Sequence, residues 1–115
     1  MSIYVYNAHL DRVVDADTVD LMVDLGFNVK MKMRVRLMGI DAPERYTPEG
    51  KVATEFVNKH LECYKDNLIL ETFKDKAGKY GRYLGVIYRG NMQNISINDE
   101  LLEKGYAVKY PKAKE

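Results

Sequence analysis

The sequence Val29-Lys-Met-Lys-Met-Arg-Val-Arg-Leu-Met-Gly-Ile-Asp-Ala-Pro-Glu44 alternates apolar and cationic residues and then reaches a proline. The odd-numbered residues from 29 to 37 are apolar, and the cations between them are Lys30, Lys32, Arg34 and Arg36. A period of two predicts a half-buried strand with its cations on the outer face. Pro43 fixes its own φ and forces the residue before it into an extended conformation, so the strand ends there. We therefore expect Arg36, Asp41 and Glu44 to share a small volume at a rigid bend.

This combination of groups suits the chemistry of phosphodiesters. A guanidinium fork complements phosphate oxygens, and carboxylates hold a hard cation or orient water. A surface strand followed by a polar turn explains the same residues without any chemistry, because short motifs carry false-positive risk. The remainder of the chain has to separate these two interpretations.

A second strand is predicted just upstream, where Val19, Leu21 and Val23 alternate with more polar residues. Residues 25–28 favour a turn, so the two strands form a hairpin. Asp17 then lies at the start of one strand and Asp41 at the end of its partner, which is the same end of the hairpin. Oxygen atoms from both aspartates, from backbone carbonyls and from water could hold a hard cation there.

The other acidic residues of this region, Asp15, Asp20 and Asp24, are interpreted as ordinary turn formers. Zinc is disfavoured because the sequence has no cluster of histidine and cysteine. His9 and His60 stand apart from each other and from any cluster of carboxylates in the sequence, and we expect both to be structural or surface residues.

Later elements follow from local signals. Thr47 can cap and Pro48 can open a helix whose apolar positions recur at helical spacing: Val52, Ala53, Phe56, Val57 and Leu61. Strands are predicted over residues 68–73 and 82–88, with a charged loop over 74–79 and a turn at 89–91 leading toward residues 92–95, so that this region forms a β meander. Ser96 and Asp99 resemble a capping box, and Gly105 suits the end of a short second helix. Residues 106–110 are expected to be extended.

This order of elements predicts a mainly β protein with helices (α+β). A closed five-stranded barrel with two packed helices leaves no exposed sheet edge, and the OB-fold is the architecture with that element count. We expect residues 1–115 to form a single domain, since 115 residues supply one modest core.

Composition limits the partners. The 46% of hydrophobic and 30% of charged residues are globular values, and the net charge of +1 means that attraction for nucleic acid would depend on local clusters. The one cysteine, Cys63, cannot form an internal disulfide. No leader peptide or membrane span is recognised in the sequence, so we expect a monomer in the cytoplasm with no membrane contact.

Four stretches together give the chain a family resemblance. They are Val13-Val-Asp-Ala-Asp-Thr-Val19, Arg36-Leu-Met-Gly-Ile-Asp-Ala-Pro-Glu44, Lys79-Tyr-Gly-Arg82 and Leu101-Leu-Glu-Lys-Gly-Tyr-Ala107. In this order and with this spacing, they resemble the staphylococcal nuclease (thermonuclease) family. The arrangement is also similar to small nucleases carried by bacteriophages, which suggests a phage-encoded enzyme acting in the host cell.

The resemblance implies an OB-fold enzyme that hydrolyses DNA and RNA with Ca²⁺ and with low sequence specificity. It implies that Asp17 and Asp41 bind Ca²⁺ through their carboxylates and Ala42 through its backbone carbonyl. By the same match, Glu44 positions or deprotonates the attacking water. The remaining matched residues contact the substrate: Arg36 and Arg82 at the scissile phosphate, Lys79 and Tyr80 at a neighbouring phosphate, and Tyr110 if one residue is missing before it.

The chain also departs from the family pattern. Ala16 stands where glycine is common, and a left-handed backbone there would disfavour alanine. Ala42 replaces a common threonine, Gly78 replaces a common acidic residue, and the chain ends before the family's last (third) helix. None of these departures removes a named catalytic group.

Two other functions fit the same sequence. One is a catalytically weak or inactive OB-fold module that binds single-stranded nucleic acid or a protein partner. The other is a structural subunit whose cationic strand face, residues 30–36, docks an acidic partner. Inactive modules typically lack one or more of the matched carboxylates and arginines, and because all five are present here, the enzyme is favoured.

Overall fold

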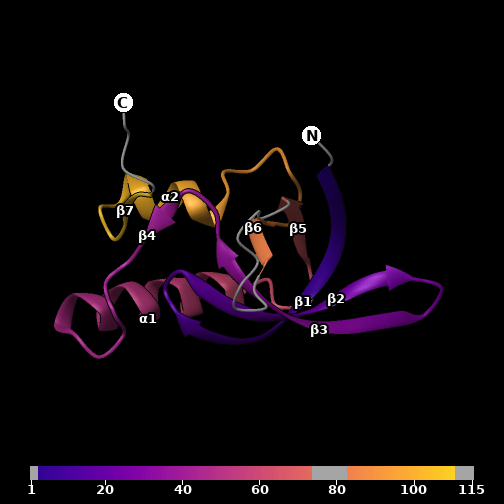
Figure 1. The fold of residues 1–115 in the computed structure, drawn as a ribbon, viewed down its shortest axis with the longest axis horizontal. Helices are drawn as coiled ribbons and strands as arrows, with labels where there is room; N and C mark the ends of the chain where they lie inside the picture. Colours follow the sequence, from indigo (N-terminus) through magenta and orange to yellow (C-terminus); the bar gives the residue numbers. More distant parts are fainter. Residues whose placement is uncertain (1–2, 74–82, 111–115) are drawn as a thin grey trace.

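The computed structural model describes residues 3–73 and 83–110 of the 115-residue chain. The elements it defines are shown in Figure 1 and run in the order β1 (Ile3–Asp15), β2 (Thr18–Gly26), β3 (Val29–Leu37), β4 (Ile40–Asp41), α1 (Pro48–Glu62), β5 (Leu68–Phe73), β6 (Tyr83–Arg89), α2 (Ile97–Glu103) and β7 (Val108–Lys109). Three predicted site residues, Lys79, Tyr80 and Arg82, lie outside the described residues, as does the predicted loop over 74–79.

Five strands close into a barrel in the order β1-β2-β3-β6-β5, with β5 pairing back onto β1. The pairing is antiparallel except between β3 and β6, which run parallel. β1 pairs with two strands along its length: residues 3–8 pair with β5, and residues 8–15 pair with β2. Register shifts in the second half of β1 bend the strand, as bulges do at barrel corners. The barrel with its two helices is the predicted α+β OB-fold.

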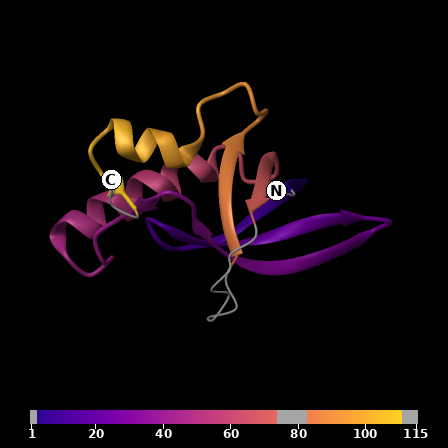
Figure 2. The same cartoon turned by 45° about the horizontal axis from the view of Figure 1, so that its top comes forward.

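The predicted hairpin of β2 and β3 is confirmed. Gly26, Phe27 and Asn28 all have positive φ, at 85°, 56° and 64°, which turns the chain tightly between the two strands. The register pairs Thr18 with Arg36, so Asp17 and the end of β3 meet at one end of the hairpin. The other end projects away from the barrel as a two-stranded arm (Figure 2).

The predicted inward face of β3 is only partly correct. Val35 and Leu37 are buried, but Val29 and Met31 are 50% and 52% exposed. The physical reason is the length of the hairpin, because among the residues that the structure describes β6 pairs with β3 only from Val35 to Leu37. The alternation in sequence fixes which residues share a face but not how far the barrel covers that face.

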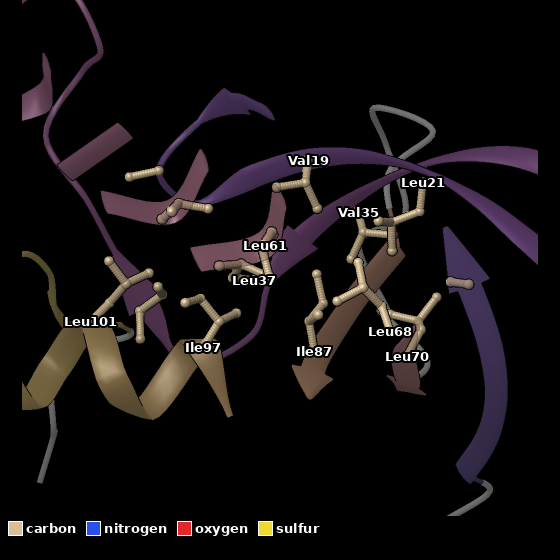
Figure 3. Packing of buried hydrophobic residues seen from close by; sticks show 14 of the residues in the cluster. Val19, Leu21, Val35, Leu37, Leu61, Leu68, Leu70, Ile87, Ile97 and Leu101 are labelled. Atoms are coloured by element: carbon tan, nitrogen blue, oxygen red, sulfur yellow. The ribbon is translucent and has the colours of Figure 1, made fainter. Parts of the chain in front are cut away.

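The core fills the closed end of the barrel and the space under both helices. Figure 3 shows Val19 and Val35 from the hairpin packed near Ile87 of β6, with Leu61 of α1 beside Leu37. Both helices begin as predicted: Thr47 accepts a hydrogen bond from the backbone of Gly50, and Ser96 accepts one from Asp99.

Two local predictions fail. Val52 is 50% exposed on α1, because the helix turns Ala53, Val57 and Leu61 toward the barrel instead. Residues 92–95 form no strand: the Asn91 side chain accepts a hydrogen bond from the Gln93 backbone, and the Asn94 side chain donates to the Arg89 carbonyl. Such side-chain bonds close a turn and compete with strand pairing.

A small second sheet ties the end of the described chain to the middle. β4 and β7 pair antiparallel, Ile40 with Lys109 and Asp41 with Val108. The Tyr110 backbone N–H also donates to the Gly39 carbonyl at 2.9 Å. The extended conformation expected for residues 106–110 is therefore found at its end. Neither described helix combines the length and the apolarity needed to cross a bilayer.

Candidate active site

The turn between β1 and β2 and the end of β3 meet at one edge of the barrel. The Leu37 backbone N–H donates to the Asp17 carbonyl at 2.8 Å, which continues the hairpin ladder past its last pair. Arg36 lies opposite Thr18, next to Asp17, and β4 follows after a turn at Gly39 with φ of +83°. The positive φ suits glycine and reverses the chain so that Asp41 returns toward Arg36.

The Arg36 guanidinium lies between the two aspartates. Its Nη1 is 3.4 Å from Asp17 Oδ2, and its Nη2 is 3.4 Å from Asp41 Oδ1. Nη2 also donates to the Ile40 carbonyl at 3.2 Å. The Arg36 side chain is 19% exposed and the Asp41 side chain 52% exposed, so the cluster opens to solvent on the Asp41 side.

Asp17 is the most enclosed member of this cluster, with 6% of its surface exposed. Besides Arg36, its carboxylate accepts hydrogen bonds from the Ala42 backbone N–H at 3.0 Å and from the Thr18 hydroxyl at 3.2 Å. These donors fix the carboxylate and connect it to the chain that carries Asp41. Ala16 is fully buried, and its φ is not positive, since the described non-glycine residues with positive φ are Phe27 and Asn28. Alanine therefore fits the turn without backbone strain.

The backbone of Glu44 is held by the start of α1, while Glu44 itself is exposed. The Glu44 carbonyl accepts hydrogen bonds from the Thr47 N–H at 3.0 Å and from its hydroxyl at 2.7 Å. Gly50 lies directly against this carbonyl, because a Cβ at Gly50 would stand 1.6 Å from the oxygen. Among the ion pairs of the described residues, none involves Glu44.

Tyr110 joins the cluster through the second sheet. The Arg36 guanidinium carbon lies 5.2 Å from the centre of the Tyr110 ring, within the range of a cation–π contact. The pairing of β4 with β7 positions the tyrosine, and its ring remains half exposed. β6 also begins here, since Tyr83 pairs with Val35 and Leu84 with Arg36.

Of the nine predicted site residues, the structure thus brings Asp17, Arg36, Asp41, Ala42 and Tyr110 together, while Glu44 lies in the segment between β4 and α1. The two histidines lie elsewhere, as predicted. His9 Nδ1 is 3.3 Å from an Asp66 oxygen, and His60 Nδ1 is 2.8 Å from the Phe56 carbonyl.

The donor atoms of the cluster fit a hard cation. Asp17 and Asp41 offer carboxylate oxygens and Ala42 a backbone carbonyl, and a Ca²⁺ ion takes six to eight oxygen ligands including water. Within the described ranges, no group of three or more histidine, cysteine, aspartate or glutamate side chains is close enough to hold a metal. A cation here would therefore depend on water or phosphate oxygens for much of its coordination.

The interpretation of Asp20 as a turn former is wrong. Asp20 lies within β2, is 3% exposed, and accepts hydrogen bonds from Arg34 Nε at 2.8 Å and Nη2 at 3.1 Å. Arg12 Nε lies 3.4 Å from the same carboxylate. The hydrogen bond from Arg34 is the main cause that holds the pKa of Asp20 below its ordinary value of 3.8, against the effect of burial. The hairpin register sets Asp20 opposite Arg34, and this pairing could have predicted the ion pair from the sequence.

Asn98 was also missed. This buried side chain donates to the carbonyls of Met38 at 2.9 Å and Gly85 at 3.0 Å, and accepts from the Ile87 N–H at 3.2 Å. It connects α2 to the turn after β3 and to β6. No local pattern marks it, because an asparagine in the first turn of a helix is usually solvated.

Fold and site together define an OB-fold domain with an arginine–carboxylate cluster at the end of a strand hairpin. Residues 34–115 match the family model described as staphylococcal nuclease homologue. The chain belongs to this family, as the sequence motifs predicted.

Relatives support the same assignment. The chain is 34% identical over 100 residues to thermonuclease of Staphylococcus intermedius. The aligned region covers 81% of this chain and 55% of that protein. The chain is 32% identical over 128 residues to an uncharacterized protein of Methanocaldococcus jannaschii, covering 91% and 59%, and 30% identical over 116 residues to endonuclease YhcR of Bacillus subtilis, covering 91% and 9%. The chain thus spans less than two thirds of each of these relatives.

Proposed function

We propose that this protein is a Ca²⁺-dependent nuclease that hydrolyses phosphodiester bonds of DNA and RNA with low sequence specificity. The observation that carries the proposal is the position of the Arg36 guanidinium, 3.4 Å from an oxygen of each of two aspartates at the solvent-open edge of the barrel. Family membership and relatives named thermonuclease and endonuclease support it.

In this proposal Asp17, Asp41 and the Ala42 carbonyl would hold Ca²⁺, which when bound supplies positive charge to a phosphate oxygen. Arg36 and Arg82 donate hydrogen bonds to the phosphoryl oxygens and stabilise the extra negative charge of the transition state. Glu44, exposed beside the cluster, orients the attacking water or accepts its proton.

Binding of a phosphate would replace part of the contact between Arg36 and the two aspartates. In the structure the guanidinium is shared between Asp17 and Asp41, and a phosphodiester would take over part of this fork with its own oxygens. Tyr110 supports the guanidinium from its ring face and limits its movement during the exchange. We assign Lys79 and Tyr80 to a neighbouring phosphate. The monomeric state, the single domain and the cytoplasmic location stay predictions.

A cleavage assay tests the proposal. Purified protein should shorten DNA and RNA when Ca²⁺ is present and should leave both intact with excess chelator. Glu44→Gln keeps the size of the side chain and removes its charge, and should lower the rate by about 10²-fold or more. Glu49→Gln is a matched control, because Glu49 is an exposed acid in the first turn of α1.

Two results would contradict the nuclease. Tight binding of single-stranded nucleic acid without shortening would favour the inactive OB-fold module. Equal cleavage by Glu44→Gln and wild type would remove Glu44 from the mechanism.

A further inference from the structure

The arm formed by residues 24–32 of the β2–β3 hairpin extends beyond the closed part of the barrel. From Val29 to Arg34, β3 pairs only with β2 within the described ranges, and β1 leaves β2 after Val23. Residues 25–32 are exposed, and Figures 1 and 2 show the arm standing clear of both helices. We propose that this arm is a second nucleic-acid contact, which holds the substrate strand beyond the catalytic site and stacks Phe27 against its bases. The inference rests on the proposed nuclease function and adds a preference for long strands.

The tip of the arm is the first observation. Phe27 is 99% exposed and has a φ of +56°, followed by Asn28 at +64°. A bulky side chain in the left-handed region is uncommon, and Asn-Gly or Asp-Gly would make this turn without strain. Phe27 gains no burial in return, so folding does not explain its presence. An exposed aromatic ring on a stiff ribbon is suited to stacking on a nucleic-acid base, which any base sequence allows.

Charge along the outer face of β3 is the second observation. Lys30, Lys32, Arg34 and Arg36 alternate along the strand and therefore share one face, which runs from the tip to the cluster at Asp17. Lys32 Nζ lies 3.2 Å from an Asp11 oxygen, and Arg34 is bound by Asp20.

Lys30 has no ion pair among the described residues. Asp24 stands opposite it in the register, but the Asp24 carboxylate accepts a hydrogen bond from the Gly26 N–H at 2.8 Å and closes the turn. Lys30 is therefore the cation of the arm most available to a phosphate.

The dimensions of the arm fit a strand of nucleic acid. Lys30 lies six residues from Arg36 on β3, which is about 20 Å at the rise of a β-strand. Phosphates of a stacked strand are about 3.4 Å apart along its axis, and those of a fully extended single strand about twice as far apart, so this distance corresponds to about three to six nucleotides. A dinucleotide held at Arg36 would not reach the arm.

The face of β3 that carries the cations of the arm also carries Arg36, and this favours nucleic acid over other binding partners. The exposed apolar residues of the arm, Leu25, Phe27, Val29 and Met31, would also suit a second copy of the chain or a bilayer surface. Only a polyanion also uses Lys30, and the face of β3 that carries Lys30 leads past Lys32 and Arg34, which have carboxylate partners, to the proposed site for the scissile phosphate.

Binding measured in chelator tests the arm separately from cleavage. Fluorescence anisotropy of a labelled dinucleotide and of labelled single-stranded DNA of about 16 nucleotides, the upper end of OB-fold site sizes, gives the ratio of long-strand to short-strand affinity. Phe27→Ala and Phe27→Leu should both lower this ratio by about fivefold or more, and Phe27→Trp should keep it. The leucine variant retains apolar area and loses the aromatic face.

Salt dependence tests Lys30. Lys30→Ala should reduce the slope of log affinity for the long strand against log salt by about 0.7, the contribution of one single-strand phosphate contact. Lys59→Ala, at an exposed lysine near the end of α1, is the matched control and should leave the slope unchanged.

The outcomes separate the two proposals. If the short strand is cleaved with Ca²⁺ and the arm variants bind the long strand like wild type, the proposed binding role of the arm is wrong and the proposed nuclease function is retained. If no strand is cleaved but long-strand affinity depends on Phe27 and Lys30, the proposed nuclease function is wrong and the arm is a binding surface for nucleic acid. Phe27-dependent dimerisation or vesicle binding, with DNA affinity unaffected by the variants, would overturn the assignment of the arm to nucleic acid.

Discussion

The Asp17 carboxylate and the Arg36 guanidinium meet 3.4 Å apart, at the end of the β2–β3 ladder where Thr18 pairs with Arg36. Their contact depends on the register of the hairpin. A slip by one residue would turn Arg36 into the barrel and a neutral side chain toward Asp17, because neighbouring residues of a strand face opposite sides. Changes that shift this register should therefore remove the cluster even when they lie far from it.

Arg36→Ala should reduce Ca²⁺-dependent cleavage of DNA by about a hundredfold or more, the effect of losing one preorganised charge donor. Arg36→Lys should restore only part of the rate, because lysine cannot bind two partners with a planar fork. Thermal unfolding of each variant checks that the fold is retained. A rate near wild type in Arg36→Ala would refute the assigned role, and the same test applies to Arg82→Ala.

Calcium affinity should respond to the charge of the cluster. An isothermal titration should give a dissociation constant of about 10⁻⁴ to 10⁻³ M, as in weak extracellular sites, because few protein ligands are present. Asp41→Asn should weaken binding by about tenfold or more. Arg36→Ala should strengthen it, since the guanidinium that competes for both aspartates is gone. Asp66→Asn, at a carboxylate beside His9, is the control. Tight binding by wild type would contradict the prediction.

Loss of the Asn98 side chain should destabilise the protein. Asn98→Ala removes partners from the Ile87 N–H and from the Met38 and Gly85 carbonyls, and we expect the free energy of unfolding in urea to fall by about 2–3 kcal/mol. Gln93→Ala, in the exposed turn before α2, should change it by less than about 0.5 kcal/mol. Equal stability of the two variants would show that the Asn98 hydrogen bonds contribute nothing to the fold.

The Asp20–Arg34 pair should make stability depend on pH. Because the folded-state pKa of Asp20 is below 3.8, the pair stabilises the protein above that pH and its contribution is lost as pH falls through the folded-state value. Asp20→Asn should cost about 1 kcal/mol at about pH 7, a modest value because Arg34 is half exposed and solvent screens it.

Urea unfolding at about pH 7 and about pH 3 measures this dependence, and the difference between wild type and Asp20→Asn should shrink at the lower pH. Glu55→Gln on the exposed face of α1 is the control. A difference that is the same at both values would rule out the carboxylate charge as its source.

The predicted strand end at Pro43 is wrong, since β3 ends at Leu37, before the turn at Gly39. Local patterns in the sequence determined the hairpin and the two helix starts. Each depends on residues close together in the chain: alternation over residues 29–37, a capping threonine before Pro48, and Ser96 three residues before Asp99. From the hairpin alone it followed that Asp17, Arg36 and Asp41 would meet at one end.

Tertiary structure decided what distant segments contribute. The parallel pairing of β3 with β6, the seating of Tyr110 over Arg36 by β7, and the buried roles of Asp20 and Asn98 all depend on contacts between residues far apart in the sequence. Periodicity specifies which side chains share a face, but the depth to which that face is buried depends on which strands and helices close over it. For this reason the same alternating strand that supplies Val35 to the core leaves Met31 exposed on the arm.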